Sequence, residues 1–166
     1  MTLPASFSIR ERAAGDEAWI VPALRSAWGS TVVVSRGRSH DARHLPGLVA
    51  EHEGRPAGLL TYRIDEGEME IVTLQALERR AGVGRELIEA AREIARGAAC
   101  GRVWAVTTND NLVAIAFYRH VGWRLAAIHR EAVLAARAIK AEIPAIGENG
   151  IPIEDEWEFE IVEAGP

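Results

Sequence analysis

Two closely spaced glycines with arginines on either side are the residues whose types and spacing first suggest chemistry in this chain. Gly82 and Gly84 lie in the stretch ERRAGVGRELIEAA, immediately before a run with one apolar stripe. At the start of a helix, the backbone N–H groups have no partner within the helix and carry the positive end of its dipole. Glycines let such a backbone approach an anion closely, and Arg79, Arg80 and Arg85 add positive charge around it. The stretch is therefore either a simple helix start or the cradle of a phosphate group.

Two common phosphate-binding motifs do not fit this stretch. The dinucleotide fingerprint needs a third glycine in the pattern G-x-G-x-x-G, and the corresponding residue here is Leu87. A P-loop needs the ending G-K-[ST], which the chain does not contain. The pattern that remains is a strand, a turn, R-x-x-G-x-G and a helix, in which Arg79 is the first residue of the motif. This pattern alone still allows a helix start without a ligand.

A second motif follows after one short apolar strand, in the stretch NDNLVAIAFYRHVGW. Asn111 is placed to cap a helix, because its side-chain oxygen can accept a hydrogen bond from a free backbone N–H group. Ala114, Phe117 and Val121 recur at helical spacing, and Tyr118 lies about two turns into the expected helix. The two motifs together decide how the glycine stretch is interpreted.

This pair of motifs resembles that of the GCN5-related N-acetyltransferase (GNAT) superfamily. R-x-x-G-x-G after the fourth strand is similar to that family's acetyl-CoA pyrophosphate loop. N-x-x-A-x-x-F-Y-x-x-x-G-[FW] is similar to its second cofactor motif, here Asn111, Ala114, Phe117, Tyr118, Gly122 and Trp123. The resemblance covers the chain from Leu48 to Trp123. It departs from the common family pattern at Ala76, where many members have proline, and at Arg80 and Ala81, where a glycine and a basic residue are frequent.

The resemblance implies acetyl-CoA as the cosubstrate and no metal. In the family, the pantetheine arm pairs with the backbone of the fourth strand, and an amide there, near Leu74 or Gln75, can face the thioester oxygen. Asn111 would hydrogen-bond the pantetheine or pyrophosphate arm as well as cap its own helix. The residues implied in cofactor binding are Leu74, Arg79, Arg80, Ala81, Gly82, Val83, Gly84, Arg85 and Asn111.

The resemblance also implies residues for proton transfer. Tyr118 corresponds to the tyrosine that the family places close to the thioester sulfur, and a phenol is protonated at neutral pH, so it could give its proton to the departing thiolate. Glu70 lies on the strand that carries the glutamate base in histone-type members, with Glu68 two residues earlier, whereas many members use a water chain. His129 and His52 are further candidates for the base. The predicted catalytic residues are therefore Tyr118 as general acid and Glu70 as base.

The implied activity is N-acetyl transfer from acetyl-CoA to a primary amine of a small molecule or peptide, directly within a ternary complex. The alternative is a module of the same fold that binds acyl-CoA as a sensor without turnover, although Tyr118 and the complete R-x-x-G-x-G favour catalysis. In the family, the acceptor site comes from segments that correspond to Trp19–His44 and Arg130–Pro152. The basic segment Arg36–His44 would suit an acceptor with a carboxylate or phosphate, whereas the net charge of −5 would suit a polyamine or aminoglycoside. The sequence leaves both acceptor classes open.

The elements that position these residues are predicted from periodicity and turn residues. A helix is expected from a cap at Asp16 through Trp28. The expected strands are Leu48–His52, Ala57–Ile64, Glu68–Leu77, Val103–Thr107, Trp123–Ile128 and Glu156–Val162, and the further helices are Val83–Arg96, Asn111–Val121 and Ala132–Lys140. Gly122 is expected to end a helix in the left-handed conformation. With the resemblance, these elements predict an α/β fold: a GNAT-like mixed, mostly antiparallel sheet of about six to seven strands, with splayed central parallel strands and helices on both faces.

Length and composition limit the class of protein. With 166 residues, of which 48% are hydrophobic and 26% charged, the chain is expected to form one globular domain over 1–166. No apolar stretch reaches the roughly 18 residues of a membrane span, and the N-terminus lacks a secretory pattern, so a cytoplasmic address is expected. Cys100 is the only cysteine, which excludes an intrachain disulfide and a cysteine-rich zinc site. The net charge of −5 argues against nucleic-acid binding. Members of the family often form dimers by sharing or abutting C-terminal strands, so the resemblance suggests a homodimer through Glu156–Val162.

Overall fold

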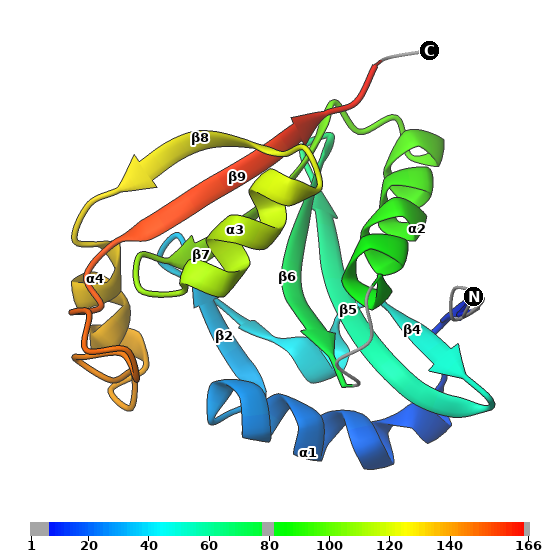
Figure 1. Ribbon diagram of the computed structural model, residues 1–166, viewed down its shortest axis with the longest axis horizontal. Helices are drawn as coiled ribbons and strands as arrows, with labels where there is room; N and C mark the ends of the chain where they lie inside the picture. The colour runs from blue at the N-terminus through cyan, green and yellow to red at the C-terminus, as the bar shows by residue number, and fades with distance from the viewer. Residues whose placement is uncertain (1–6, 78–81, 165–166) are drawn as a thin grey trace, which may run out of the picture.

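A seven-stranded mixed sheet is the framework of the molecule (Figure 1). The computed structural model describes residues 7–77 and 82–164. In spatial order, the strands are β1 (Ser8–Glu11), β4 (Gly47–His52), β5 (Arg55–Asp65), β6 (Glu68–Ala76), β7 (Arg102–Thr108), β9 (Glu156–Val162) and β8 (Arg124–His129). All neighbouring strands are antiparallel except β6 and β7, which are parallel. The predicted mixed, mostly antiparallel sheet is therefore confirmed.

Helices cover both faces of this sheet (Figure 1). The remaining elements are η1 (Ala14–Asp16), α1 (Glu17–Trp28), a hairpin of β2 (Val32–Ser35) and β3 (Arg38–Asp41), η2 (Ala42–His44), α2 (Val83–Gly97), α3 (Leu112–His120) and α4 (Ala132–Ile139). Leu59 of β5 packs with Ile20 and Leu24 of α1, whereas the adjacent Leu60 belongs to the larger cluster beneath α2 and α3. Successive side chains of a strand point to opposite faces. Consequently α1 lies on one face, and α2 and α3 lie on the other.

The parallel strands β6 and β7 diverge at the centre of the sheet. They pair only over Glu68–Glu70 of β6 and Arg102–Trp104 of β7. Beyond these residues β7 stays paired with β9, and β6 stays paired with β5. The β5–β6 register shifts between Thr61 and Tyr62, where Val72 is an extra residue on β6, and such a bulge bends the strand that carries it. The predicted splay is therefore present, and among the described residues the β7-facing edge of β6 beyond Glu70 has no strand partner.

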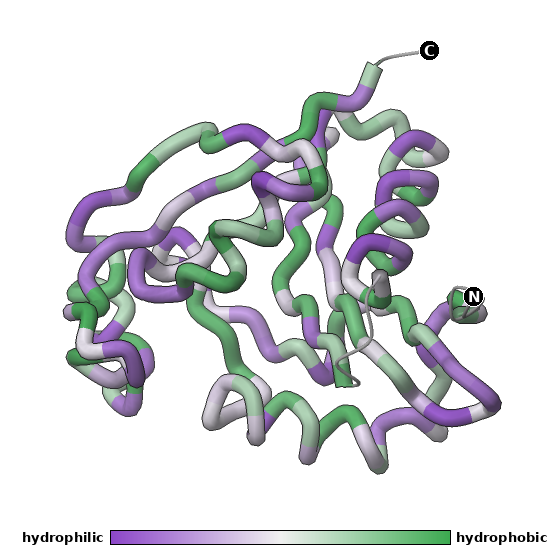
Figure 2. Tube along the Cα trace, viewed as in Figure 1, coloured by the Kyte–Doolittle hydropathy of each residue, from purple (hydrophilic) through white to green (hydrophobic). Residues whose placement is uncertain are grey.

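The apolar stripe predicted for residues 83–96 is the buried face of α2. Five of its members are fully buried: Val83, Leu87, Ile88, Ala91 and Ala95. Ile94, also part of the predicted stripe, is partly buried against the same cluster. Hydrophilic and hydrophobic positions alternate along this helix in Figure 2, as expected when one side faces the sheet and the other faces solvent. This packing holds the first turn of α2 against β5 and β6.

Gly58 on β5 lets the first turns of α2 lie directly on the sheet. A Cβ added at Gly58 would lie 2.5 Å from Val83 Cγ1 and 2.9 Å from Leu87 Cδ1. We therefore expect Gly58→Ala to lower the free energy of unfolding by about 1–3 kcal/mol, because a well-packed core tolerates added volume poorly. Gly97→Ala is the matched control, because nothing lies within 4 Å of a Cβ added there. Urea denaturation measures both variants, and equal stabilities would contradict this packing.

Some features differ from the expectation. The prediction lacks β1 and the β2–β3 hairpin, because strands of four residues are too short to show a clear period. Asp16 precedes α1, but its side chain does not cap the helix. Its carboxylate instead accepts hydrogen bonds from both terminal nitrogens of Arg10 and from the Trp19 indole. Gly122 does adopt the predicted left-handed conformation, with φ of 88°.

The position of β9 also bears on the predicted homodimer. This strand lies between β7 and β8 and is paired along both of its edges. A strand must have a free edge before a second copy can extend the sheet through it. Glu156–Val162 therefore offers no edge for strand pairing, and a homodimer stays a prediction without this contact.

Candidate active site

Two clefts meet where β6 and β7 diverge. The helix-side cleft has a volume of about 770 Å³ and is lined by the end of β6 and by residues of α2 and α3. The hairpin-side cleft has a volume of about 550 Å³ and is lined by the end of α1, by β2, β6 and β7, and by part of the segment 140–156. Asn111 lines both clefts, so they adjoin at the start of α3.

The start of α2 faces the helix-side cleft and is suited to an anion. Gly82 precedes the helix with φ of 107°, and no side chain of the described residues caps the helix. The first helical hydrogen bond runs from the Glu86 N–H to the Gly82 carbonyl oxygen at 2.9 Å, so the N–H groups of the three residues between them have no acceptor within the helix. Gly84 lies against Phe117, whose ring would be 3.1 Å from an added Cβ. Free N–H groups, the helix dipole and an accessible glycine backbone fit a phosphate group.

The structure gathers much of the predicted cofactor site in this cleft. Its lining includes Leu74, Gly82, Gly84, Arg85 and Asn111. Val83 is fully buried, so only its backbone can take part. Asn111 caps α3 as predicted, accepting a hydrogen bond from the Ala114 N–H at 3.1 Å. The other predicted residues lie outside the described part of the chain: Arg79, Arg80 and Ala81.

Tyr118 lines the helix-side cleft from α3 and is only 6% exposed. Its ring stacks on Phe159 with a centroid distance of 5.5 Å and contacts Trp123 at 5.1 Å and Phe117 at 5.5 Å. Burial raises the pKa of the Tyr118 hydroxyl well above its ordinary value, because the phenolate would lose its hydration. The hydroxyl accordingly keeps its proton at neutral pH, as a general acid must. Its catalytic role stays a prediction.

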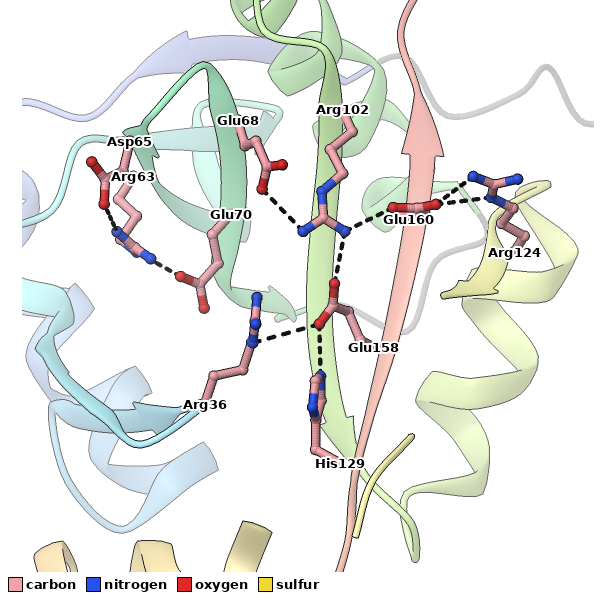
Figure 3. Close-up of polar contacts among 10 residues, drawn as sticks. All are labelled: Arg36, Arg63, Asp65, Glu68, Glu70, Arg102, Arg124, His129, Glu158 and Glu160. Atoms are coloured by element: carbon pink, nitrogen blue, oxygen red, sulfur yellow. Dashed lines mark hydrogen bonds and ion pairs between the residues drawn. The ribbon is translucent and has the colours of Figure 1, made fainter. Parts of the chain in front are cut away.

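Glu70 lies on the other side of the splay, in the hairpin-side cleft, and is 2% exposed. The Ser35 hydroxyl donates to its Oε1 at 2.5 Å. Arg63 Nε donates to its Oε2 at 2.6 Å (Figure 3). His40 Nε2 lies 3.9 Å from Oε2. Both oxygens of Glu70 are therefore engaged before any amine arrives, and its role as base stays a prediction.

The other predicted candidates for the base line neither cleft. Glu68 forms an ion pair with Arg102 at 3.0 Å. His129 Nε2 lies 2.7 Å from a carboxylate oxygen of Glu158. His52 belongs to β4, where its ring contacts Phe7 with a centroid distance of 5.7 Å.

Alternating residues of β9 place a row of carboxylates on one face of the sheet, namely Glu156, Glu158 and Glu160. Arg102 Nη1 donates to both Glu158 and Glu160 at 2.7 Å (Figure 3). Arg124 Nη2 donates to Glu160 at 2.6 Å, and His129 contacts Glu158. These glutamates are not among the predicted site residues, although their alternation in EWEFE indicates that they share one face of a strand.

The basic segment Arg36–His44 forms the turn of the hairpin, β3 and η2. Its arginines each have a carboxylate partner: Glu158 for Arg36 at 3.7 Å, Asp65 for Arg38 at 3.4 Å and Asp41 for Arg43 at 2.5 Å. Its positive charges are therefore largely compensated within the protein.

Lys140 ties the segment 140–156 to the rest of the hairpin-side cleft. Its Nζ donates to the backbone carbonyl oxygens of Trp28 at 2.8 Å and Val32 at 3.0 Å. Burial lowers the pKa of this ammonium group. These bonds make the segment a wall of the cleft beside α1 and β2.

Over residues 7–77 and 82–164, no group of three or more His, Cys, Asp or Glu side chains could hold a metal ion. None of the helices in these ranges is long and apolar enough to cross a membrane.

Comparison with known families agrees with this arrangement. The model of the acetyltransferase (GNAT) family matches residues 17–123, which is more than half of the chain. The chain therefore belongs to the acetyltransferase (GNAT) family, and the resemblance seen in its motifs is confirmed. It is 39% identical over 133 residues to the uncharacterized protein YdhI of Bacillus subtilis (strain 168), an alignment that covers 80% of this chain and 83% of that protein.

Solved structures share the fold at lower identity. A Bacillus subtilis acetyltransferase in complex with CoA superposes with a TM-score of 0.68 and 17% identity, covering 96% of this chain and 100% of that chain. A GNAT family acetyltransferase from Elizabethkingia anophelis with acetyl-CoA bound has a TM-score of 0.66 and 18% identity, covering 95% and 98%. The predicted GNAT-like fold is thus confirmed.

Proposed function

We propose that residues 1–166 form one N-acetyltransferase domain that moves an acetyl group from acetyl-CoA to a primary amine of a small molecule or peptide, directly within a ternary complex. The observation that carries the proposal is that a cleft with a phosphate-type cradle and a buried tyrosine adjoins a second, acidic cleft at the splay of β6 and β7. One cleft would take the donor and the other the acceptor. Family membership and relatives described with CoA or acetyl-CoA support this division.

The helix-side cleft offers groups that would hold acetyl-CoA. The backbone N–H groups at the start of α2, from Val83 to Arg85, would bind the pyrophosphate, and Gly82 leaves open space in front of them. The unpaired edge of β6 at Leu74 would pair with the pantetheine arm and could direct an N–H group at the thioester oxygen. When bound, acetyl-CoA supplies an acetyl thioester, an activated form of the acyl group. Tyr118 holds the proton that the departing thiolate needs.

The hairpin-side cleft favours a cationic acceptor. Two buried carboxylates line it, Glu70 and Glu156, while the ammonium group of Lys140 is already bound to backbone carbonyl oxygens. The arginines of segment Arg36–His44 are paired with carboxylates, so they offer little free positive charge to an acidic acceptor. Of the two acceptor classes that the sequence leaves open, the structure supports a polyamine- or aminoglycoside-like amine over an amino acid.

Release of free CoA from acetyl-CoA across a panel of amines tests the proposed function. Lysine and cadaverine are a matched pair, because they differ only by a carboxylate. We expect cadaverine to react with a kcat/KM at least about tenfold higher, because the carboxylate would meet like charges in the cleft. Faster turnover of lysine would contradict the acceptor class. Acetyl-CoA binding without turnover of any amino acid, polyamine, aminoglycoside or peptide would instead identify the protein as an acyl-CoA-binding sensor.

A further inference from the structure

Glu156 differs from the other two carboxylates of its strand. Glu158 and Glu160 each have cationic side chains as partners. Glu156 is only 3% exposed, and in the part of the chain that the structure describes its carboxylate forms no ion pair. Its one hydrogen bond there comes from the backbone N–H of Arg36, 3.0 Å from Oε2. Burying a carboxylate without a cationic partner costs free energy, so the presence of a glutamate at this position needs an explanation.

The location of Glu156 in the hairpin-side cleft suggests why a glutamate stands there. It lines the hairpin-side cleft, and no hydrogen bond from the described residues reaches its second oxygen, Oε1. Its neighbour on β7 is Thr108, close to Asn111, where the two clefts adjoin. An amine that enters the hairpin-side cleft toward this junction would meet the free oxygen of Glu156. Glu70 lines the same cleft, but both of its oxygens already accept side-chain hydrogen bonds.

We propose that Glu156, rather than Glu70, binds the ammonium group of the acceptor and takes a proton from it. This inference rests on the proposed function and names the residue that completes it. Glu70 then holds the hairpin to the sheet through Ser35 and keeps the cleft acidic. The free Oε1 of Glu156 replaces part of the hydration that the ammonium loses on entering the cleft.

The proton balance is complete with two side chains. One N–H bond of the acceptor ammonium breaks and an O–H bond forms on Glu156, which frees the nitrogen lone pair. That lone pair forms the C–N bond as the C–S bond breaks, and the thiolate takes the proton of Tyr118. The nitrogen gives up its second proton, which restores Tyr118, and Glu156 releases its proton to solvent. Each turnover therefore yields one amide, one thiol and one proton.

The charges around Glu156 are consistent with a base. Burial raises the pKa of its carboxyl as the largest effect. The next largest effects come from the Arg36 N–H at the hairpin turn and from His129 on β8, which lower this pKa. Glu70 on β6 raises it and the Arg36 guanidinium lowers it, both more weakly. Glu158 follows two residues later on the same strand, and Lys140 and Glu142 line the same cleft. A carboxylate with a raised pKa is a stronger proton acceptor than an ordinary one.

Glu156→Gln tests the proposal, because glutamine keeps the size of the side chain and an oxygen for the Arg36 N–H. We expect kcat/KM for the best amine of the panel to fall by about 100-fold or more. In wild type, kcat/KM should rise with pH as Glu156 loses its proton. The variant should lose that rise and regain rate only as the free amine itself becomes deprotonated. Acetyl-CoA affinity, measured by calorimetry, should stay within twofold of wild type.

Stability gives a second readout that a structural role would not produce. A raised folded-state pKa means that the carboxyl stabilises the fold when protonated, and this stability is lost as pH rises through the raised value. Glutamine cannot ionise, so Glu156→Gln should melt at a higher temperature than wild type above that pH. Glu160→Gln is the matched control on the same face of the same strand. It removes one of the three carboxylate partners of Arg102 and the carboxylate that pairs with Arg124, so we expect a lower melting temperature with the pH profile of kcat/KM retained.

The outcomes separate this inference from the proposed function. A wild type that turns over amines, with a Glu156→Gln variant that keeps its rate and pH profile, would overturn the role of Glu156 alone. If the rise of kcat/KM with pH were lost in Glu70→Gln and kept in Glu156→Gln, Glu70 would be the base. A wild type that binds acetyl-CoA and acetylates no amine would overturn the proposed function and this inference together.

Discussion

Gly82→Glu is expected to abolish acetyl-CoA binding while leaving the fold intact. The new carboxylate would stand at the start of α2, where it would accept hydrogen bonds from the free N–H groups and repel a diphosphate. Hydrogen bonds to charged groups contribute about 1.5–3 kcal/mol each, so losing two of them lowers the affinity by about 100-fold or more. Because Gly82 has φ of 107°, any other residue there is also strained. Calorimetric titration with acetyl-CoA measures the loss.

Two further variants separate charge from strain. Gly82→Ala has the unfavourable backbone conformation without the charge, so it should lose some stability and keep most of its acetyl-CoA affinity. Gly97→Glu places the same charge at the other end of α2, where an added Cβ has nothing within 4 Å. It should bind acetyl-CoA as wild type does. Wild-type affinity in Gly82→Glu would mean that the start of α2 is not the pyrophosphate site.

The parts of this fold that the sequence predicts are formed by residues that lie close together in the chain. The stripe of α2 repeats Val83, Leu87 and Ala91 at helical spacing, and all three are buried as the period indicates. The cap at Asn111 and the left-handed Gly122 are also local events. The two cofactor motifs consist of such local features, and for this reason the sequence alone indicates the family.

Some local features could not be predicted in this way, because a competing side-chain partner or an uncommon turn residue hides the pattern. Asp16 has a cap-like position, but Arg10 on β1 and Trp19 draw its carboxylate away from the helix. The β2–β3 turn uses Arg36 and Gly37 with φ of 48° and 74°. Hairpin turns with two positive φ values usually carry Asn-Gly or Asp-Gly, so Arg-Gly gives only a weak signal.

The acceptor side of the site is hardest to predict, because it depends on partners that are distant in the sequence. Lys140 builds one wall by binding carbonyl oxygens of Trp28 and Val32, more than a hundred residues earlier in the chain. The alternation of β9 predicts a strand, but it does not say which of its glutamates finds a cationic partner. Only the folded structure shows that Arg102 donates hydrogen bonds to Glu158 and Glu160, whereas Glu156 lines a cleft.

Tyr118→Phe is expected to lower kcat by about 100-fold, within the range that general acid catalysis contributes, while acetyl-CoA affinity stays within twofold of wild type. Phenylalanine keeps the ring that stacks on Phe159 and contacts Trp123. Within the described residues, no hydrogen bond involves the Tyr118 hydroxyl, so its removal should change the free energy of unfolding by less than about 1 kcal/mol. A large kinetic effect with small effects on binding and stability is what the loss of one proton donor predicts.

The control is Tyr62→Phe, since Tyr62 is the second of the two tyrosines of the chain and lies on β5, outside both clefts. Its kcat should match wild type. Because burial raises the pKa of Tyr118, the hydroxyl stays protonated across the usual assay range, and kcat in wild type should not fall on the alkaline side until well above the ordinary pKa of a tyrosine. An unchanged kcat in Tyr118→Phe would remove Tyr118 as the acid and leave the thiolate to be protonated by solvent.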